Sequence, residues 1–132
     1  MEWRLYKEFF RALGSPARFR IVQLLRRGPR HVGQIAEQLG FEQSRVSHNL
    51  ACLLHCGFVL WNWAGKNKIY QLNPEMAPIL AGIEKHLARY APALDSCRIL
   101  ERESAPVVVL AKTEAPPRNV RRMARRLGRN RR

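Results

Sequence analysis

The sequence has few acidic residues, and its C-terminal end has none. The 132 residues include 24 lysines and arginines against 10 aspartates and glutamates, which gives a formal net charge of +14. Residues 118–132 hold eight arginines and no acid, so residues 1–117 carry the remaining +6. A positive field of this size favours a polyanionic partner, and nucleic acid is the first candidate.

Several features that would indicate other classes of protein are missing. No apolar run approaches the ~20 residues needed to span a bilayer, and the N-terminus shows no signal-peptide pattern. The three cysteines are an odd number, which argues against a disulfide framework. The sequence has no glycine-rich phosphate loop, nucleophile elbow or carboxylate pair placed for acid-base chemistry. We therefore expect a cytoplasmic protein that is not an enzyme and has no membrane partner.

The first half of the chain predicts four short helices. Apolar residues at helical spacing occur in residues 3–13, 16–27, 32–39 and 43–56. Ser15 and Pro16 are suited to begin the second helix, and Gly40 is suited to end the third. Two short helices joined by a tight turn that contains glycine are the sequence form of a helix-turn-helix.

The chain after residue 57 predicts a hairpin followed by a long helix. Residues 58–63 and 68–72 are typical of strands, and the four residues between them are typical of a turn. Residues 73–94 follow as a helix, in which Pro92 is expected to produce a kink or an end.

The predicted fold class is mainly α with a small β-hairpin wing, that is, a winged helix-turn-helix. We assign residues 1–97 to one DNA-binding and dimerisation domain, and residues 98–132 to a C-terminal extension with an arginine-rich tail. Residues 104–117 match no single element. The tail from residue 118 is expected to be a disordered arm that contacts DNA nonspecifically, with a basic helix that folds on DNA as the alternative.

The helix at residues 43–56 has one apolar and one polar face. On a helical wheel the apolar stripe consists of Val46, Leu50, Leu53 and Leu54. The side chains expected to meet base edges lie near the start of this recognition helix: Gln43, Ser44, Arg45, Ser47 and His48. Contacts to phosphates are expected from Lys66 and Lys68 in the wing and from Arg121, Arg122, Arg125 and Arg126 in the tail. A merely solvated polar face is the alternative, and the basic wing and strong positive field favour DNA.

Three runs of residues resemble the ArsR/SmtB family of metalloregulatory repressors. They are residues 12–21 (ALGSPARFRI), 34–40 (QIAEQLG) and 43–50 (QSRVSHNL), and the resemblance extends over residues 5–95. It implies a homodimer formed through the terminal helices. It also implies that the metal-free dimer binds imperfect palindromes of double-stranded operator DNA and releases them when metal binds.

The cysteines form one close pair and one distant residue. Cys52 and Cys56 are four residues apart on the predicted recognition helix, so two thiolates there can bind one ion. Inert, buried cysteine is the common structural alternative. Within the ArsR/SmtB family, residues 52–57 and the distant Cys97 look like the CmtR-type cadmium and lead sensors. That resemblance implies that all three cysteines bind the metal, with Cys97 supplied by the same subunit or by its partner.

Three thiolates without a carboxylate would form a soft metal site. Such a site suits Cd(II) or Pb(II), with As(III) and Hg(II) as further candidates, better than magnesium or calcium. Two other metal sites of the family are not recognisable. Residues 30–33 stand in place of its third-helix cysteine motif, and Glu84 with His86 resembles its last-helix zinc site only weakly. His55, between the paired cysteines, is expected to face DNA.

Two other functions fit the same residues. A redox switch would keep the fold and release DNA when Cys52 or Cys56 is oxidised. A ligand-free architectural DNA-binding protein would fit the charge, but it would not need a recognition helix with serine and histidine side chains.

Overall fold

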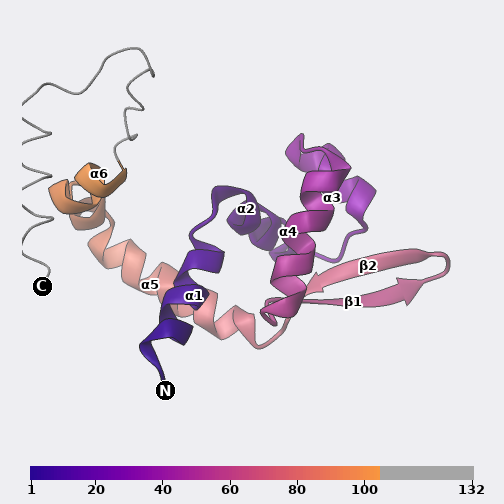
Figure 1. Cartoon of the computed structure of the whole chain (residues 1–132), viewed down its shortest axis with the longest axis horizontal. Helices are drawn as coiled ribbons and strands as arrows, with labels where there is room; N and C mark the ends of the chain where they lie inside the picture. Colours follow the sequence, from indigo (N-terminus) through magenta and orange to yellow (C-terminus); the bar gives the residue numbers. More distant parts are fainter. Residues whose placement is uncertain (105–132) are drawn as a thin grey trace, which may run out of the picture. The chain divides into compact units, whose positions relative to one another are not determined.

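The computed structural model describes residues 1–104, which form six helices and one hairpin (Figure 1). The elements are α1 (Trp3–Leu13), α2 (Pro16–Arg26), α3 (Val32–Leu39), α4 (Gln43–His55), β1 (Val59–Ala64), β2 (Asn67–Leu72), α5 (Met76–Asp95) and α6 (Arg98–Ser104). The chain divides into two compact units, residues 1–91 and a second unit that begins at Pro92. Four helices, a hairpin and a long helix in this order confirm the predicted winged helix-turn-helix.

Capping interactions fix the ends of the short helices. Ser15 Oγ accepts a hydrogen bond from the backbone N–H of Arg18 at 3.4 Å, which begins α2. His31 Nδ1 accepts a hydrogen bond from the backbone N–H of Gln34 at 3.2 Å, which begins α3. Gly40 ends α3 with a φ of 67°, a left-handed conformation that favours glycine. These caps leave only a short turn between α3 and α4.

The hydrophobic core lies between α2, α3, α4 and the start of the hairpin. Its fully buried side chains include Ile21, Ile35, Val46, Leu50, Leu53 and Val59. The sequence places Leu54 in the buried stripe of α4, but this side chain is only partly buried. Asn49 is buried instead, and its Nδ2 donates to the carbonyl oxygen of Arg45 at 3.0 Å. Because the backbone accepts this hydrogen bond, the amide is tolerated in the core.

The hairpin is longer than the sequence predicts. Strand β1 pairs with β2 in antiparallel register up to Ala64 opposite Asn67, so only Gly65 and Lys66 form the turn. The predicted turn of four residues was too long. Gly65 has a φ of 62°, and a positive φ in the turn permits a two-residue connection that matches the twist of the strands.

Arg30 attaches the base of the hairpin to the helices. Its backbone N–H donates to the carbonyl oxygen of Tyr70 at 2.9 Å, and its own carbonyl oxygen accepts from the Tyr70 N–H at 2.8 Å. Its guanidinium Nη1 donates to the carbonyl oxygens of Leu24 and Gly28 at 2.7 and 2.6 Å. The wing is therefore held at its base while its tip extends into solvent.

The last long helix ends close to where the sequence predicts. Helix α5 includes Pro92 and ends at Asp95, one residue past the predicted end at residue 94. Pro92 has no backbone N–H to donate to the preceding turn, and the helix ends three residues later. Helix α6 lies in residues for which the sequence predicts no element. None of the helices within residues 1–104 is long and apolar enough to cross a membrane.

Candidate nucleic-acid interface and thiol pair

The polar face of α4 is open to solvent. The side chains that the sequence predicts for contact with DNA are all exposed: Gln43, Ser44, Arg45, Ser47 and His48. On the opposite face, Val46, Leu50 and Leu53 are fully buried against the helical body. The apolar side thus fixes α4 on the domain, while its first two turns remain free to enter a groove.

Arg45 is held in place by an aromatic ring from the turn before α4. Its guanidinium carbon lies 4.3 Å from the centroid of the Phe41 ring, and that of Arg20 from α2 lies 5.1 Å from the same centroid. Such cation–π contacts orient an arginine without neutralising it. In the described part of the chain, neither arginine forms an ion pair with a carboxylate. Two unneutralised guanidinium groups therefore meet at the start of the recognition helix.

Arg20 is a candidate DNA contact that the sequence analysis missed. Its position in α2 gives no indication of where its side chain lies, because α2 is assigned from its apolar stripe. The sequence feature that could have indicated this contact is Phe41, an aromatic residue in a turn that is otherwise suited to polar residues. The structure shows that Phe41 is partly buried.

The wing adds positive charge beside α4. Lys66 and Lys68 are exposed, and Lys68 Nζ lies 4.4 Å from the centroid of the Trp61 ring. Figure 1 shows the hairpin extending from the end of α4 away from the helices. No acidic residue occurs from Gln43 to Pro74. The positive charge of α4 and the wing is therefore complementary to the negative charge of a DNA backbone. The predicted tail contacts, Arg121, Arg122, Arg125 and Arg126, lie outside the described residues.

Cys52 and Cys56 form a pair one turn apart at the end of α4. The backbone N–H of Cys56 donates to the carbonyl oxygen of Cys52 at 3.0 Å. Cys52 is partly buried and Cys56 is exposed, and neither is in a disulfide. Both thiols are therefore available on the same side of the helix.

The surroundings of Cys56 favour its protonated form. Burial raises the pKa of this thiol, and the neighbouring Cys52 raises it further through its charge and a hydrogen bond. Arg18 lowers the pKa and Glu8 raises it by smaller amounts. A metal ion must displace the proton from Cys56, so its affinity is expected to fall as the pH falls.

The third cysteine lies in the second unit. Cys97 follows α5, is partly buried, and its carbonyl oxygen accepts from the N–H of Glu101 at 3.0 Å, so it stands just before α6. Within residues 1–104, no three histidine, cysteine, aspartate or glutamate side chains are close enough to hold a metal ion. The structure thus brings together two of the three predicted ligands.

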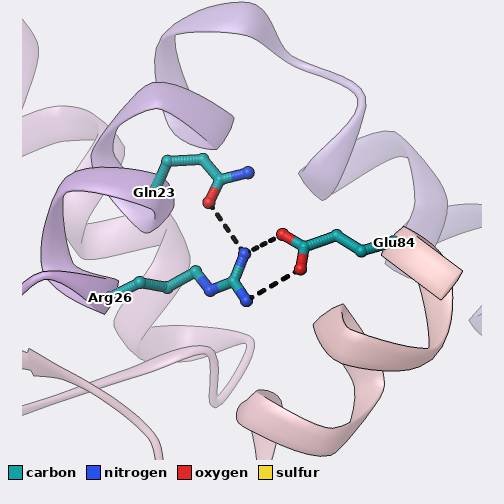
Figure 2. Close-up of polar contacts among 3 residues, drawn as sticks. All are labelled: Gln23, Arg26 and Glu84. Atoms are coloured by element: carbon teal, nitrogen blue, oxygen red, sulfur yellow. Dashed lines mark hydrogen bonds and ion pairs between the residues drawn. The ribbon is translucent and has the colours of Figure 1, made fainter. Parts of the chain in front are cut away.

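Glu84 is occupied by an ion pair within the subunit. Figure 2 shows that the Arg26 guanidinium contacts Gln23, which is also in α2, and Glu84 of α5. Arg26 Nη2 donates to Glu84 Oε2 at 3.2 Å, and this guanidinium holds the pKa of the carboxyl below its ordinary value. The centroids of the His86 and Tyr90 rings are 4.7 Å apart. The paired carboxylate joins α5 to α2, which gives it a structural role.

The comparisons with known proteins agree with this geometry. The profile of the arsR family of bacterial regulatory proteins matches residues 15–60, which contain the helix-turn-helix. A probable mercury resistance operon repressor of Streptomyces lividans is 38% identical over 90 residues, covering 67% of this chain and 72% of that protein. The chain belongs to the arsR family. The predicted resemblance is confirmed, and this ArsR-family protein is a DNA-binding transcriptional regulator and not an enzyme.

Two other similar proteins extend the comparison. The transcriptional regulator CmtR of Mycobacterium tuberculosis is 38% identical over 79 residues, covering 60% of this chain and 58% of CmtR. A homodimeric winged helix-turn-helix DNA-binding domain of Mycobacterium bovis, solved by NMR, has a TM-score of 0.57 and 26% identity. That similarity covers 66% of this chain and 81% of the solved domain.

Proposed function

We propose that this ArsR-family protein is a repressor that binds operator DNA as a homodimer and is released by a soft metal ion. The observation that carries the proposal is the position of the thiol pair. Cys52 and Cys56 lie at one end of α4, whose other end exposes Arg45 and the rest of its polar face. A ligand that binds the thiols therefore acts directly on the helix that reads DNA.

On the DNA side, α4 enters the major groove with its first two turns. Gln43 pairs with adenine, Arg45 with guanine or phosphate, and the short side chains of Ser44, Ser47 and His48 contact base edges. The wing lysines and the tail arginines neutralise phosphates. In a symmetric dimer the two recognition helices must be about 34 Å apart to read both halves of a palindrome.

Arg45→Ala should weaken binding to a selected duplex by about 5- to 150-fold, because one good bidentate base contact contributes ~1–3 kcal/mol. Arg45→Lys should recover only part of this loss, since lysine lacks the planar fork. Phe41→Ala should give an intermediate loss by freeing the guanidinium. Fluorescence anisotropy with a DNA duplex selected from random sequence measures all three.

Arg4→Ala is the matched control for Arg45, because it removes the same charge from an exposed position in α1. Equal losses for Arg4→Ala and Arg45→Ala would show that only net charge matters and would remove Arg45 from the reading face.

The terminal helices offer apolar surface for a dimer. In α1, Trp3, Leu5, Tyr6 and Phe10 are exposed, and α5 exposes Ile79, Leu87 and Tyr90. An open apolar hollow of about 360 Å³ is lined by residues of the N-terminal segment and α1. Apolar surface of this kind is typical of protein interfaces, and the similar domain of Mycobacterium bovis is homodimeric.

The metal site consists of Cys52, Cys56 and Cys97, with the last supplied by either subunit. The thiol pair fits a soft ion, since thiolates select Cd(II), Pb(II), As(III) and Hg(II) over hard cations. Similarity to a mercury resistance repressor and to CmtR supports a metal effector. The three free thiols also fit action in the reducing cytoplasm. Joining α4 to Cys97 needs only ~1–3 kcal/mol of coupling to change DNA affinity by about 5- to 150-fold.

Titration of the full chain with Cd(II), Pb(II) and As(III) tests the function. Thiolate-to-metal absorption in the ultraviolet should rise to one ion per site while the selected duplex is released. Peroxide applied to the reduced protein is the second arm. In a metal sensor, peroxide should release less of the duplex than a stoichiometric amount of Cd(II) does. Release by peroxide without any response to metal would replace the metal sensor with a redox switch.

Selection from random DNA also separates the regulator from a ligand-free architectural protein. A palindrome should be enriched if two symmetric recognition helices read sequence. Binding without sequence preference would support the architectural function.

A further inference from the structure

A hollow with two arginines lies on the outer face of α2. From Arg20, the residues three, four and seven positions further on are Gln23, Leu24 and Arg27, so helical geometry puts all four on one face. With Leu39 at the end of α3, they line an open hollow of about 260 Å³. We call the space lined by these residues the α2 pocket.

The polar groups of the α2 pocket are hydrogen-bond donors. Arg20 and Arg27 are exposed, and within the described residues 1–104 neither forms an ion pair. The side-chain oxygen of Gln23 accepts from Arg26 Nη1 at 3.0 Å, and Glu84 holds Arg26 from the other side (Figure 2). The amide nitrogen of Gln23 is therefore available to donate. Two guanidinium groups and one amide nitrogen together select an anion.

The floor of the α2 pocket is apolar. Leu24 is only 8% exposed and lies between the two arginines along α2, and Leu39 is partly buried. A ligand that covers these leucines gains affinity only if it brings an apolar surface of its own, since a polar group buried there would lose its hydrogen bonds to water.

We propose that the α2 pocket binds a small organic phosphate. A phosphate monoester carries about two negative charges and three acceptor oxygens, which suits two guanidinium groups and one amide nitrogen. The apolar body of the ligand packs on the two leucines. The site uses none of the residues of the thiol pair, so it goes beyond the proposed response to metal.

The size of the α2 pocket favours a small molecule. Pockets for small molecules measure ~300–1,000 Å³, and a volume just below this range suits a ligand not much larger than one ring and its phosphate. A protein partner would need an interface of about 800 Å² on each side. A DNA strand that contacts Arg20 would have to extend about two helical turns, ~10 Å, along α2 to meet Arg27 as well.

Arg20 connects the α2 pocket to the recognition helix. Its guanidinium carbon lies 5.1 Å from the centroid of the Phe41 ring, and that of Arg45 lies 4.3 Å from the same centroid. A phosphate bound to Arg20 neutralises one of the two positive charges at the start of α4. The bound ligand therefore weakens DNA binding, and this part of the inference rests on the proposed function.

Isothermal titration calorimetry of the full chain tests the α2 pocket with phenyl phosphate as the probe. Salt at about 0.15 M screens attraction to the rest of this basic protein beyond ~8 Å. Phenyl phosphate should bind once per chain and about ten-fold more tightly than inorganic phosphate, because its ring buries apolar area. Benzyl alcohol, which has the ring without the charge, should not bind. Equal affinities for phenyl phosphate and inorganic phosphate would overturn the assigned ligand class, and so would tighter binding of benzoate.

Variants at Arg27 locate the binding site. Arg27→Gln should reduce the affinity for phenyl phosphate about ten-fold, as expected for a lost charge-assisted hydrogen bond. Arg27→Lys should recover part of the loss, because lysine keeps the charge without the planar fork. Arg89→Gln is the matched control, since it removes the same charge from an exposed position in α5, and its affinity should stay unchanged. Equal losses for Arg27→Gln and Arg89→Gln would show nonspecific attraction and would overturn the inference.

Anisotropy of the selected duplex distinguishes failure of this inference from failure of the proposed function. Saturating phenyl phosphate should weaken duplex binding about five-fold, at the lower end of typical coupling, in both the unchanged chain and Cys56→Ser. It should have no effect on Arg27→Gln. If Arg27→Gln itself binds the duplex less tightly than Arg89→Gln, a DNA phosphate occupies the α2 pocket and the inference is wrong. If the unchanged chain binds phenyl phosphate but no duplex, only the proposed function fails.

Discussion

Cys56→Ser protein is expected to bind the selected duplex normally and to remain bound when Cd(II) is added. The exposed Cys56 side chain contributes little to the core, so serine should leave the fold and α4 intact. The loss of one of three thiolates should reduce metal affinity by more than about 100-fold, since changes even to the partners of metal ligands cost 10- to 100-fold. Cys52→Ser and Cys97→Ser should behave in the same way.

Neighbouring residues provide matched controls for the cysteine variants. His55→Ala changes the exposed residue next to Cys56 and should keep the metal response, because we place His55 outside the ligand set. Ser96→Ala removes the side-chain hydrogen bond from Ser96 Oγ to the Pro92 carbonyl oxygen and changes the residue before Cys97. It should also keep the response. Ultraviolet absorption and DNA anisotropy, measured on the same samples, report metal binding and release separately.

A triple cysteine variant that Cd(II) still releases from DNA would eliminate the thiol site as the sensor. If only Cys97→Ser kept the full response, the metal site would consist of Cys52, Cys56 and a ligand other than Cys97. The first result would contradict the proposed metal sensing, and the second would contradict only the assignment of Cys97 as a ligand.

Deletion of residues 118–132 is expected to reduce the salt dependence of DNA binding. The segment contains eight arginines and no acid. Each neutralised phosphate contributes about 0.9 to the slope of log K against log salt concentration, so the slope could decrease by as much as ~7. The affinity at low salt should fall with it, whereas the preferred DNA sequence should stay the same, because phosphate contacts carry no sequence information.

Two tail variants test whether charge alone explains this effect. Lysine at Arg121, Arg122, Arg125 and Arg126 keeps the charge and should keep the slope, while glutamine at the same positions should reduce the slope by roughly half of the effect of the deletion. A slope unchanged by the deletion would show that the tail does not contact phosphates. A changed sequence preference would instead indicate that tail side chains reach base edges.

Local patterns were sufficient to predict most of the fold. The apolar spacing of Val46, Leu50 and Leu53, the cap at Ser15 and the stop at Gly40 all depend on residues within a few positions of each other. The error in the hairpin also has a local cause. Its turn was predicted too long because Ala64 and Asn67 can pair in an extended conformation.

The sequence by itself determined the charge of the chain, the number and spacing of its thiols, and the exposed polar face of α4. These properties follow from composition and from helical periodicity. Only the tertiary structure decided that Phe41 holds Arg45 and Arg20, that Glu84 is paired with Arg26, and that Lys68 lies over the wing tryptophans. Each of these contacts joins residues of different elements, and such contacts depend on how the elements pack rather than on the pattern within any one of them.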